Sequence, residues 1–501
     1  LTSDTDSIPN FATLPIDFGT SFSQVSTMDL GQPSLLLNPG EYGIPSEFYF
    51  DRDSGILVGQ DALDAGQGIA AANLVTGVKM RIVSGKCFVL DGRRFTAKDI
   101  VKEICKSLVA TARHVARKRF MDTCIEGAVV SVPAKFGIQE RHLIAEAVKE
   151  CISPESLPIK AVIKEPVAAA IAYYYKNQVA DGSHILVYDL GGGTCDIALV
   201  RADSSVDERF VVVDSDMVRI GGRNWDEKLC DYIADVLECK TDGGIRGNAG
   251  FDEKIRRAAI SVKHDLSNPT KDRSMARVEL NGTIYTVPIS RSVFDEITLP
   301  LLQQTFDCLQ DVYERNALSC RIDEIICVGG SSNMLQVEEG LLRRFPRCRI
   351  RLYEPEHAVV NGATIYAHMP HEFLTDVASF SYGTDSNTHY GFPDNKKVVS
   401  NIIKRGTRLP AVCSRSYCPT RAGQEGVVFN IFESEFLDED FDMANPEKRL
   451  VGTVRLLLPP NSPKDISLCC KLRLDVNGLL DVEASEPSGR KVAATFNIRT
   501  L

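Results

Sequence analysis

The sequence of 501 residues lacks any apolar run near the roughly 20 residues that a membrane-spanning helix needs. Residues 1–13 are polar and acidic, without the basic-then-apolar pattern of a secretory signal. Lys and Arg (57) are fewer than Asp and Glu (67), and the net charge of −10 disfavours non-specific nucleic-acid binding. The 15 cysteines include no Cys-x-x-Cys pair, and most, such as Cys105, Cys230 and Cys327, have apolar neighbours. We therefore expect reduced core thiols in a cytoplasmic protein, and no zinc site, membrane partner or nucleic-acid partner.

The stretch Ile185–Val200 consists of two apolar runs around a polar, glycine-rich tip, which predicts a β-hairpin whose tip is nearly bare backbone. The residues of this tip are Asp189, Gly191, Gly192, Gly193, Thr194 and Asp196. Backbone N–H groups there can surround a phosphate, and the carboxylates can hold the waters of a bound Mg²⁺. No Gly-Lys-Ser/Thr follows, so this is not a Walker loop. An ordinary glycine-rich hairpin is the alternative interpretation of this stretch alone.

A second copy of the pattern favours the phosphate interpretation. Leu14–Val25 again has an apolar run, Asp17, Gly19 and small hydroxyl residues, with Asp17 matching Asp189 and Gly19 matching Gly191. Two such hairpins, separated by one long α/β unit, indicate a duplicated architecture with nucleotide held between its halves. The pair resembles the actin-like ATPase superfamily, which includes sugar kinases and chaperone ATPases.

Other segments predict the rest of an α/β domain followed by an all-β domain. We expect a helix over Phe95–Phe120 whose basic end is solvated, a buried strand over Gly127–Pro133 and a closely packing small-residue helix over Val167–Tyr175. Gly221-Gly222 and the Gly-Gly-Ser that ends Ile325–Ser332 are turns where ligand can meet backbone. Beyond about residue 370 short alternating runs replace helical periodicity, and Asn477-Gly478 predicts a hairpin.

Several stretches in this order resemble the DnaK-type, 70-kDa heat-shock chaperone family over nearly all of residues 14–500. They are Ile16–Ser21, Val130–Phe136, Lys164–Tyr173, Asp189–Asp196, Gly221-Gly222, Val328–Ser332 and Glu354–Val359. The resemblance implies an actin-like ATPase domain of duplicated ribonuclease-H-like halves at 14–371, after an N-terminal extension at 1–13. It further implies a linker at 372–378 and a β-sandwich peptide-binding domain at 379–501, with the sequence ending before the family's helical lid.

The resemblance also implies ATP hydrolysis with Mg²⁺, coupled to binding and release of extended apolar polypeptides in protein folding and stress response. Lys79 would orient the attacking water, Glu165, Asp189, Thr194 and Asp196 would complete the catalytic set, and Asp17 and Asp189 would position Mg²⁺ through water. The matching ATP/ADP-binding residues are Gly19, Thr20, Ser21, Phe22, Gly191, Gly192, Gly193, Thr194, Gly221, Gly222, Lys263, His264, Ser267, Gly329, Gly330, Ser331, Asn333 and Glu356.

Two further sets of residues follow from the same resemblance. Pro133 and Arg141 would relay the nucleotide state toward the linker. The peptide channel would consist of Thr384, Asn387, Tyr417, Thr420, Val427 and Phe429. Val427, Phe429 and Ile431 alternate to one face, so a plain sandwich core is the competing interpretation of these positions.

The chain also departs from the family pattern. Ile260 replaces a glutamate on the adenosine side, and His264 and Asn333 stand where a stacking arginine is common. Ala161 and Lys164 replace residues of the J-domain co-chaperone interface, which makes a standard interface of that kind doubtful; Lys135 replaces a tyrosine. The incomplete leucine run of the linker resembles specialised, HscC-type paralogues. A nucleotide-binding co-chaperone or regulator with little ATPase activity is therefore the alternative function, while the β domain disfavours a kinase or cytoskeletal protein.

Overall fold

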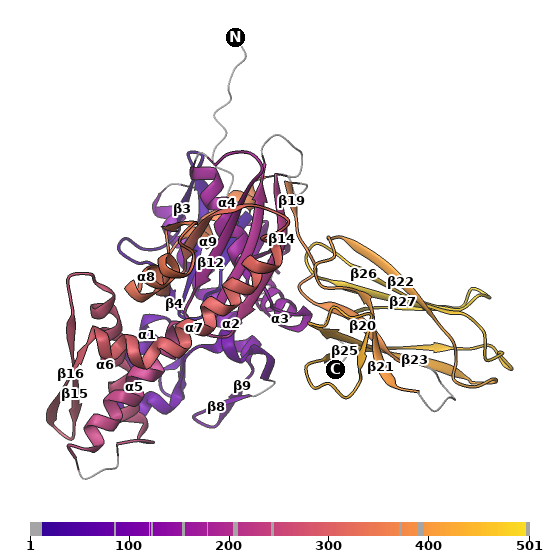
Figure 1. Cartoon of the computed structure of the whole chain (residues 1–501). Coiled ribbons are helices and arrows are strands. Elements are labelled where there is room, and N and C mark those ends of the chain that lie inside the picture. The colour runs from indigo at the N-terminus through magenta and orange to yellow at the C-terminus, as the bar shows by residue number, and fades with distance from the viewer. Residues whose placement is uncertain are drawn as a thin grey trace. The chain divides into compact units, whose positions relative to one another are not determined.

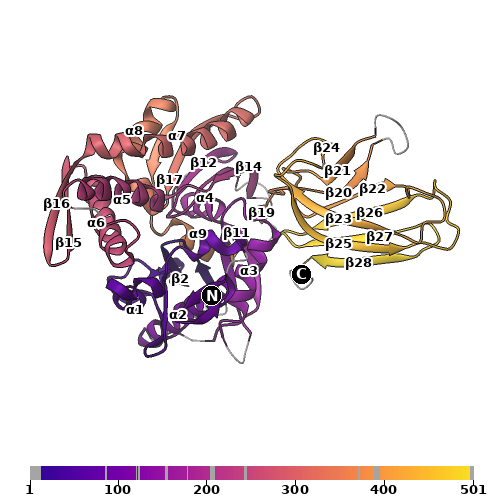
Figure 2. The same ribbon diagram turned by 90° about the horizontal axis from the view of Figure 1, so that it is seen from below.

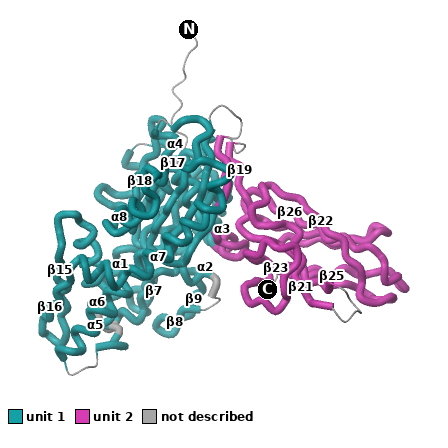
Figure 3. The backbone as a smooth tube through the Cα atoms, in the orientation of Figure 1, with its two compact units in different colours: residues 1–134, 144–206, 215–371 teal, residues 135–143, 207–214, 372–501 magenta. Residues whose placement is uncertain are grey.

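The computed structural model describes residues 13–84, 87–119, 121, 124–152, 156–177, 179–203, 209–241, 245–369, 373–388 and 395–496. The N-terminal extension predicted at 1–13 lies outside these residues except for Thr13. The chain divides into two compact units (Figure 3). Unit 1 comprises Leu1–Ala134, Ile144–Val206 and Ser215–His371; unit 2 comprises Lys135–Leu143, Asp207–Asp214 and Glu372–Leu501.

Unit 1 contains a sheet that positions the first predicted hairpin. Its strands are β1 (Thr13–Asp17), β2 (Phe22–Asp29), β3 (Gln32–Leu35), β4 (Ile44–Pro45), β10 (Gly127–Val132) and β11 (Ile159–Lys164). Their order is β11-β10-β1-β2-β3, with β4 pairing beside β2. β1 runs antiparallel to β2 and parallel to β10, so the hairpin tip after Asp17 lies at the carboxyl end of the parallel strands.

A second sheet positions the second hairpin. Its strands are β12 (Ser183–Leu190), β13 (Cys195–Ala202), β14 (Phe210–Val218), β17 (Ile322–Val328) and β18 (Arg349–Leu352), in the order β18-β17-β12-β13-β14. As β1 does with β2 and β10, β12 runs antiparallel to β13 and parallel to β17. If the five strands in each of these two orders are numbered along the chain, both sheets have the order 5-4-1-2-3. The short β19 (Leu374–Thr375) pairs with Phe210 and Val211, which belong with it to unit 2.

Helices and small sheets complete the α/β part of the chain (Figures 1 and 2). The helices are α1 (Gln60–Ala65), α2 (Ala97–Lys118), α3 (Ile138–Lys149), α4 (Glu165–Lys176), α5 (Gly222–Glu238), α6 (Ala249–Ser267), α7 (Arg291–Asn316), α8 (Leu335–Arg344) and α9 (Ala358–Ala367), with 3-10 turns η1 (Gly68–Asn73), η2 (Val78–Ser84) and η3 (Gly330–Asn333). The small sheets contain β5 (Phe48–Asp51), β6 (Gly55–Val58) and β7 (Leu74–Val75), then β8 (Phe88–Leu90) and β9 (Arg93–Phe95), then β15 (Arg273–Leu280) and β16 (Thr283–Ser290).

Two of these helices show how local sequence sets the elements. α2 begins at Ala97 rather than at the predicted Phe95, because Thr96 and Asp99 form a capping box there. α4 is rich in small residues, as predicted, and packs tightly against α9: a Cβ at Gly362 would lie 1.7 Å from the carbonyl oxygen of Ala168. Only glycine permits so close an approach between the two helices.

Most of unit 2 is a two-sheet β structure, as the alternating runs predicted. One sheet has the order β24-β21-β20-β23-β25 and the other the order β22-β26-β27-β28. The bounds are β20 (Ser381–Asn387), β21 (Lys397–Ile403), β22 (Ala411–Tyr417), β23 (Gly426–Ser434), β24 (Asp440–Asp442), β25 (Arg449–Leu457), β26 (Leu468–Leu474), β27 (Leu480–Ser485) and β28 (Lys491–Phe496). Both sheets contribute to one apolar core, and Asn477-Gly478 turns between β26 and β27, with φ of +82° at Gly478.

Two features predicted from composition can be checked in the structure. All 15 cysteines are free thiols, of which Cys105 and Cys327 are buried as expected and Cys230 is half-buried. Among the described residues, no helix combines the length and the apolar character needed to cross a membrane.

Candidate functional site

The two predicted hairpins meet in unit 1 although 172 residues separate Asp17 from Asp189. A Cβ at Gly192 would lie 2.4 Å from the Ser21 hydroxyl oxygen, and one at Gly193 would lie 2.8 Å from the Thr20 methyl group. The two tips are therefore packed with almost no side chain between them. This is the arrangement in which both sets of backbone N–H groups can face one ligand.

Four carboxylates and a lysine, which we call the acidic cluster, gather beside the hairpin tips. Its members are Asp17, Lys79, Glu165, Asp189 and Asp196. Lys79, on η2, is buried rather than at the surface, and its Nζ donates a hydrogen bond of 2.5 Å to Glu165 Oε1 at the start of α4. Asp189 and Asp196 face each other directly across the second hairpin.

Neighbouring strands orient two of these carboxylates. Asp17 Oδ1 accepts a hydrogen bond of 2.6 Å from the Ser131 hydroxyl at the end of β10. Asp196 Oδ1 accepts one of 2.6 Å from the backbone N–H of Ala134, just after the same strand. β10, predicted as a buried strand ended by Pro133, thus holds the two aspartates in fixed orientations.

The acidic cluster has more negative charge than its lysine can neutralise. Burial, with Asp196 and Asp17 as further negative neighbours, raises the pKa of Glu165 to about 8 despite Lys79. Burial also raises the pKa of Asp196 to about 6 and that of Asp189 well above its usual range. Burial lowers the pKa of Lys79, but Glu165, Asp17 and Asp196 outweigh it and the net shift is upward.

These carboxylates suit a hydrated divalent cation. Among the described residues, Asp196 Oδ2 is buried and accepts no hydrogen bond, so an acceptor is available there. Oxygen-only ligands fit Mg²⁺, which retains several of its waters when it binds proteins. Within the same residues no group of three or more His, Cys, Asp or Glu side chains could hold a metal ion by itself. The arrangement therefore fits Mg²⁺ held through waters and ligand phosphates.

The other predicted glycine turns converge on the second hairpin. A Cβ at Gly221 would lie 2.3 Å from the backbone nitrogen of Gly193, and one at Gly329 would lie 2.4 Å from the Leu190 carbonyl oxygen. The Ser331 hydroxyl donates a hydrogen bond of 2.9 Å to the Gly191 carbonyl. The sequence signals at 221–222 and 329–331 thus mark segments that approach the glycine tip of the second hairpin.

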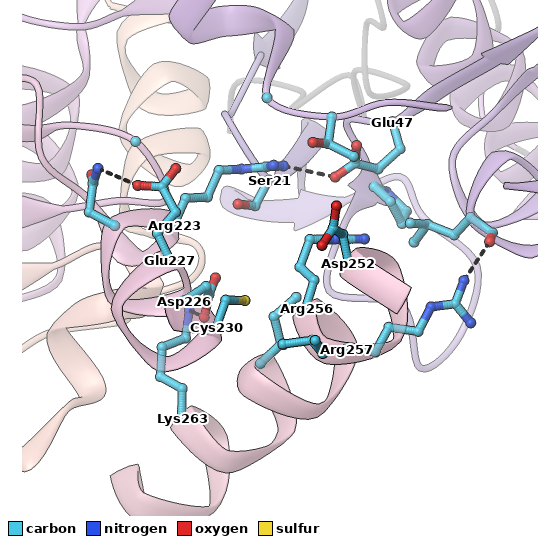
Figure 4. A pocket seen from close by; sticks show the side chains of 18 of the residues that line it. Ser21, Glu47, Arg223, Asp226, Glu227, Cys230, Asp252, Arg256, Arg257 and Lys263 are labelled. Atoms are coloured by element: carbon cyan, nitrogen blue, oxygen red, sulfur yellow. Dashed lines mark hydrogen bonds and ion pairs between the residues drawn. The ribbon is translucent and has the colours of Figure 1, made fainter. Parts of the chain in front are cut away.

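A cavity of about 840 Å³ opens beside the hairpin tips (Figure 4). Predicted residues that line it include Ser21, Phe22, Gly193, Lys263 and His264, together with Ile260. Its size suits a nucleotide-sized ligand. The other predicted ATP/ADP-binding residues do not line this cavity. Among them, the Asn333 amide donates to the Gly330 carbonyl in η3, and Glu356 is exposed.

On the cavity wall, α6 presents its polar residues toward α5. Lys263 Nζ lies 2.7 Å from Asp226 Oδ1 and donates a hydrogen bond to the Gly222 carbonyl. The Ser267 hydroxyl bonds to the Lys263 carbonyl one turn earlier, and burial lowers the pKa of His264. Lys263 is therefore already paired, which the sequence pattern did not predict.

Sequence reasoning also missed a pair that joins the two sides of the site. Arg223 Nη2 donates to Glu47 Oε1 at 2.8 Å and to the Thr20 carbonyl at 3.2 Å. One signal was available: Arg223 is in the first turn of α5, where the positive end of the helix dipole disfavours a cation. A cation placed against that preference points to a partner elsewhere.

The two predicted switch residues lie in different units. Pro133 is buried and follows β10 in unit 1. Arg141 is in the part of α3 that belongs to unit 2, where it donates to the Phe136 carbonyl and, at 3.0 Å, to the Ser379 hydroxyl. Its relay role stays a prediction.

The predicted peptide-channel residues lie in the β structure of unit 2, where several are covered by the core. Phe429 and Ile431 belong to the apolar core, and the Tyr417 ring packs on Phe429 with centroids 5.8 Å apart. Thr384 is fully buried, while Val427 is partly buried against the core. Asn387 and Thr420 are half-buried. The core interpretation holds for Phe429 and Ile431, which are buried. Val427 and Tyr417 are packed against the core but keep partial access to solvent.

One comparison with known proteins identifies the family. The family model described as Hsp70 protein matches residues 78–499, well over half of the chain. The match begins at η2, which carries Lys79, and extends through the last strand of unit 2. The same span contains the second hairpin, the α5 and α6 segments of the cavity and both β sheets of unit 2. The chain therefore belongs to the Hsp70 protein family.

Proposed function

We propose that this protein is an ATP-dependent molecular chaperone, in which unit 1 binds and hydrolyses Mg-ATP and unit 2 binds extended apolar segments of polypeptide clients. The observation that carries the proposal is the acidic cluster beside two touching phosphate hairpins. Those hairpins come from sheets with the same strand order, which supports a duplicated, actin-like ATPase fold. Family membership supports the same activity.

Different residues of the hairpins and the acidic cluster would bind the phosphates, hold Mg²⁺ and orient the attacking water. The hairpin N–H groups and the hydroxyls of Thr20, Ser21 and Thr194 would bind the β- and γ-phosphates. Bound Mg²⁺ neutralises phosphate charge, and Asp17 and Asp189 would hold its waters. Lys79, fixed by Glu165 at 2.5 Å, would orient a water for attack and stabilise the negative charge that develops on the phosphoryl oxygens.

In unit 2 the β structure would bind clients through Val427 and its neighbours. Unfolded polypeptides are the main partners in this proposal, with J-domain and nucleotide-exchange co-chaperones as further partners. Ala161 and Lys164, which replace residues of the J-domain interface, are both buried, so a standard interface of that kind stays doubtful. A cytoplasmic location and an HscC-type specialisation stay predictions.

A nucleotide-binding regulator with little turnover is the second candidate. Its support is the adenosine side of the cavity, where Ile260 offers no hydrogen bond and Lys263 is already paired with Asp226. Loss of one hydrogen bond weakens binding by on the order of 1 kcal/mol, which changes affinity without abolishing it.

Single-turnover ATP hydrolysis at saturating Mg-ATP, with and without an extended apolar peptide, tests the proposal. We expect hydrolysis that accelerates when the peptide is added, because client binding and the ATPase site are coupled in a chaperone cycle. Tight ATP binding without hydrolysis would favour the regulator. Absence of ATP binding would contradict both candidates.

A further inference from the structure

We propose that Arg223 is a positioning residue that clamps the two phosphate hairpins together and so controls the rate at which nucleotide leaves the site. The inference rests on the proposed function, because it assumes that nucleotide binds between the hairpins. It assigns a role to a residue pair, Arg223 and Glu47, that the sequence pattern did not single out.

The clamp begins on the side of the second hairpin. Arg223 is the second residue of α5, and its backbone N–H donates a hydrogen bond of 2.9 Å to the Gly192 carbonyl. The neighbouring N–H of Gly222 donates one of 3.0 Å to the Gly191 carbonyl. The backbone of Arg223 is thus fixed to the glycine tip of the second hairpin.

The side chain of Arg223 then reaches the opposite side of the cavity (Figure 4). One nitrogen, Nη2, donates both to the Thr20 carbonyl of the first hairpin at 3.2 Å and to Glu47 Oε1 at 2.8 Å. The guanidinium also lies against Gly77, where a Cβ would be 3.2 Å from Nη1. Gly77 directly precedes η2 and lies two residues before Lys79. One side chain therefore contacts three segments around the phosphate site.

Burial makes this pair costly to separate. The Glu47 side chain is 6% exposed and that of Arg223 is 21% exposed. Burial raises the pKa of Glu47, and Arg223 is the largest influence that counteracts this effect. If the hairpins moved apart, Glu47 would lose its main counter-charge while still largely shielded from water, which is strongly unfavourable.

The contact with Glu47 also explains how Arg223 can occupy the first turn of α5. A cation there opposes the helix dipole, and acidic residues are absent from that turn of α5. Glu47 and the Thr20 carbonyl supply the compensation from the other side of the cavity. If the contact with Glu47 is broken, the charge of Arg223 at the positive end of the α5 dipole is no longer compensated. The charges of both Arg223 and Glu47 therefore favour the closed arrangement.

Stopped-flow release of a fluorescent ADP analogue from the full chain tests the clamp. We expect Arg223→Ala and Glu47→Gln each to accelerate ADP release at least fivefold, and the double variant to be no faster than the faster single variant. Arg223→Lys keeps a charge for Glu47 but cannot reproduce the guanidinium fork, so its rate should lie between parent and Arg223→Ala.

A control variant removes the arginine of another arginine–carboxylate pair in unit 1. Arg315 Nη2 donates at 3.1 Å to the buried Asp216, and neither residue lines the cavity. Arg315→Ala should release ADP at the parental rate. Parental release rates in both Arg223 variants, or additive effects in the double variant, would overturn the clamp. If Arg223→Ala does not fold, parental ADP release in both Arg223→Lys and Glu47→Gln would overturn the clamp. A parent chain that does not bind the analogue would refute the proposed function, and the clamp with it.

Discussion

Each unit contains a buried group of charges, and the two groups differ in how completely they are neutralised. In unit 1 the acidic cluster sets four carboxylates against Lys79, and Asp196 Oδ2 has no partner among the described residues. In unit 2 two buried glutamates, Glu140 and Glu433, share one arginine, Arg449, which we call the Arg449 cluster.

The Arg449 cluster is saturated by hydrogen bonds. Arg449 Nη2 lies 3.0 Å from Glu140 Oε2, and its Nε donates to Glu433 Oε1 at 2.6 Å. The backbone N–H of Gly137 donates to the same Glu140 Oε2, and that of Ile138 donates to the second oxygen of Glu433, Oε2, at 3.4 Å. Burial raises the pKa of Glu433, and Arg449 opposes the shift. A satisfied group of this kind stabilises a fold, whereas unsatisfied buried charges like those in unit 1 are typical of ligand sites, as we propose for this cluster.

We expect the largest effect from removing the arginine of the Arg449 cluster. Arg449→Ala should lower the free energy of unfolding of unit 2 by about 3 kcal/mol, because it leaves two buried glutamates without their cation. Thermal and denaturant unfolding followed by circular dichroism measures this loss. Arg455→Ala, on the exposed face of the same strand, is the control and should change stability little. Equal stability of the two variants would show that the Arg449 cluster does not stabilise unit 2.

The corresponding change in unit 1 tests chemistry, because Lys79 belongs to the proposed ATPase site. Lys79→Ala should reduce single-turnover ATP hydrolysis by about tenfold or more, with nucleotide binding largely retained, because Lys79 acts on the charge that develops during hydrolysis. Lys98→Ala removes an exposed lysine paired with Glu150 and should leave hydrolysis at the parental rate. If Lys79→Ala loses binding and turnover equally, Lys79 holds nucleotide rather than orienting water.

Dependence on pH gives a smaller test of the unsatisfied group. Without a cation, Glu165 and Asp196 have pKa values of about 8 and about 6, above their ordinary values of 4.5 and 3.8. The folded chain therefore keeps protons that the unfolded chain releases, and this contribution to stability is full below the ordinary pKa values and is lost as pH rises through 6 to 8.

Bound Mg²⁺ with ADP should prevent this loss of folding stability at high pH, because the cation balances the negative charge of the carboxylates. The stabilisation by saturating Mg-ADP, measured as the shift in thermal unfolding, should therefore be larger at pH 8 than at pH 6 by about 1 kcal/mol. ADP with EDTA is the reference at each pH. A stabilisation that shrinks between pH 6 and pH 8 would mean that the acidic cluster does not receive the cation.

The sequence was sufficient for features that depend on local pattern. Alternating apolar runs and glycine tips located both hairpins, small residues located α4, and Asn477-Gly478 located the β26–β27 turn. Charge pairing between distant segments could not be predicted in this way. Glu47 and Arg223 are 176 positions apart, and no periodicity links them. The grouping of 135–143 with unit 2 likewise depends on tertiary contacts, such as those of Glu140 with Arg449.

The smallest expected effect concerns the apolar part of unit 2, where sequence reasoning left channel and core open. Val427 and Val428 are neighbours on β23, but Val427 is partly buried against the core and Val428 is 46% exposed. If Val427 contacts clients, Val427→Ala should weaken binding of an extended apolar peptide a few-fold, since about 0.8 kcal/mol is lost for each CH₂ group removed from a contact.

Fluorescence anisotropy with a labelled peptide measures this difference in affinity. Val428→Ala removes the same atoms from the adjacent position, where successive side chains point to opposite faces of the sheet, and should leave peptide affinity unchanged. Phe429→Ala serves as the core reference and should destabilise unit 2 by about 3 kcal/mol or more, because it leaves a cavity among buried side chains. Equal peptide affinities of the Val427 and Val428 variants would assign Val427 to the sandwich core. The apolar client site would then lie elsewhere on unit 2, and only unit 1 would retain a functional site that the sequence located.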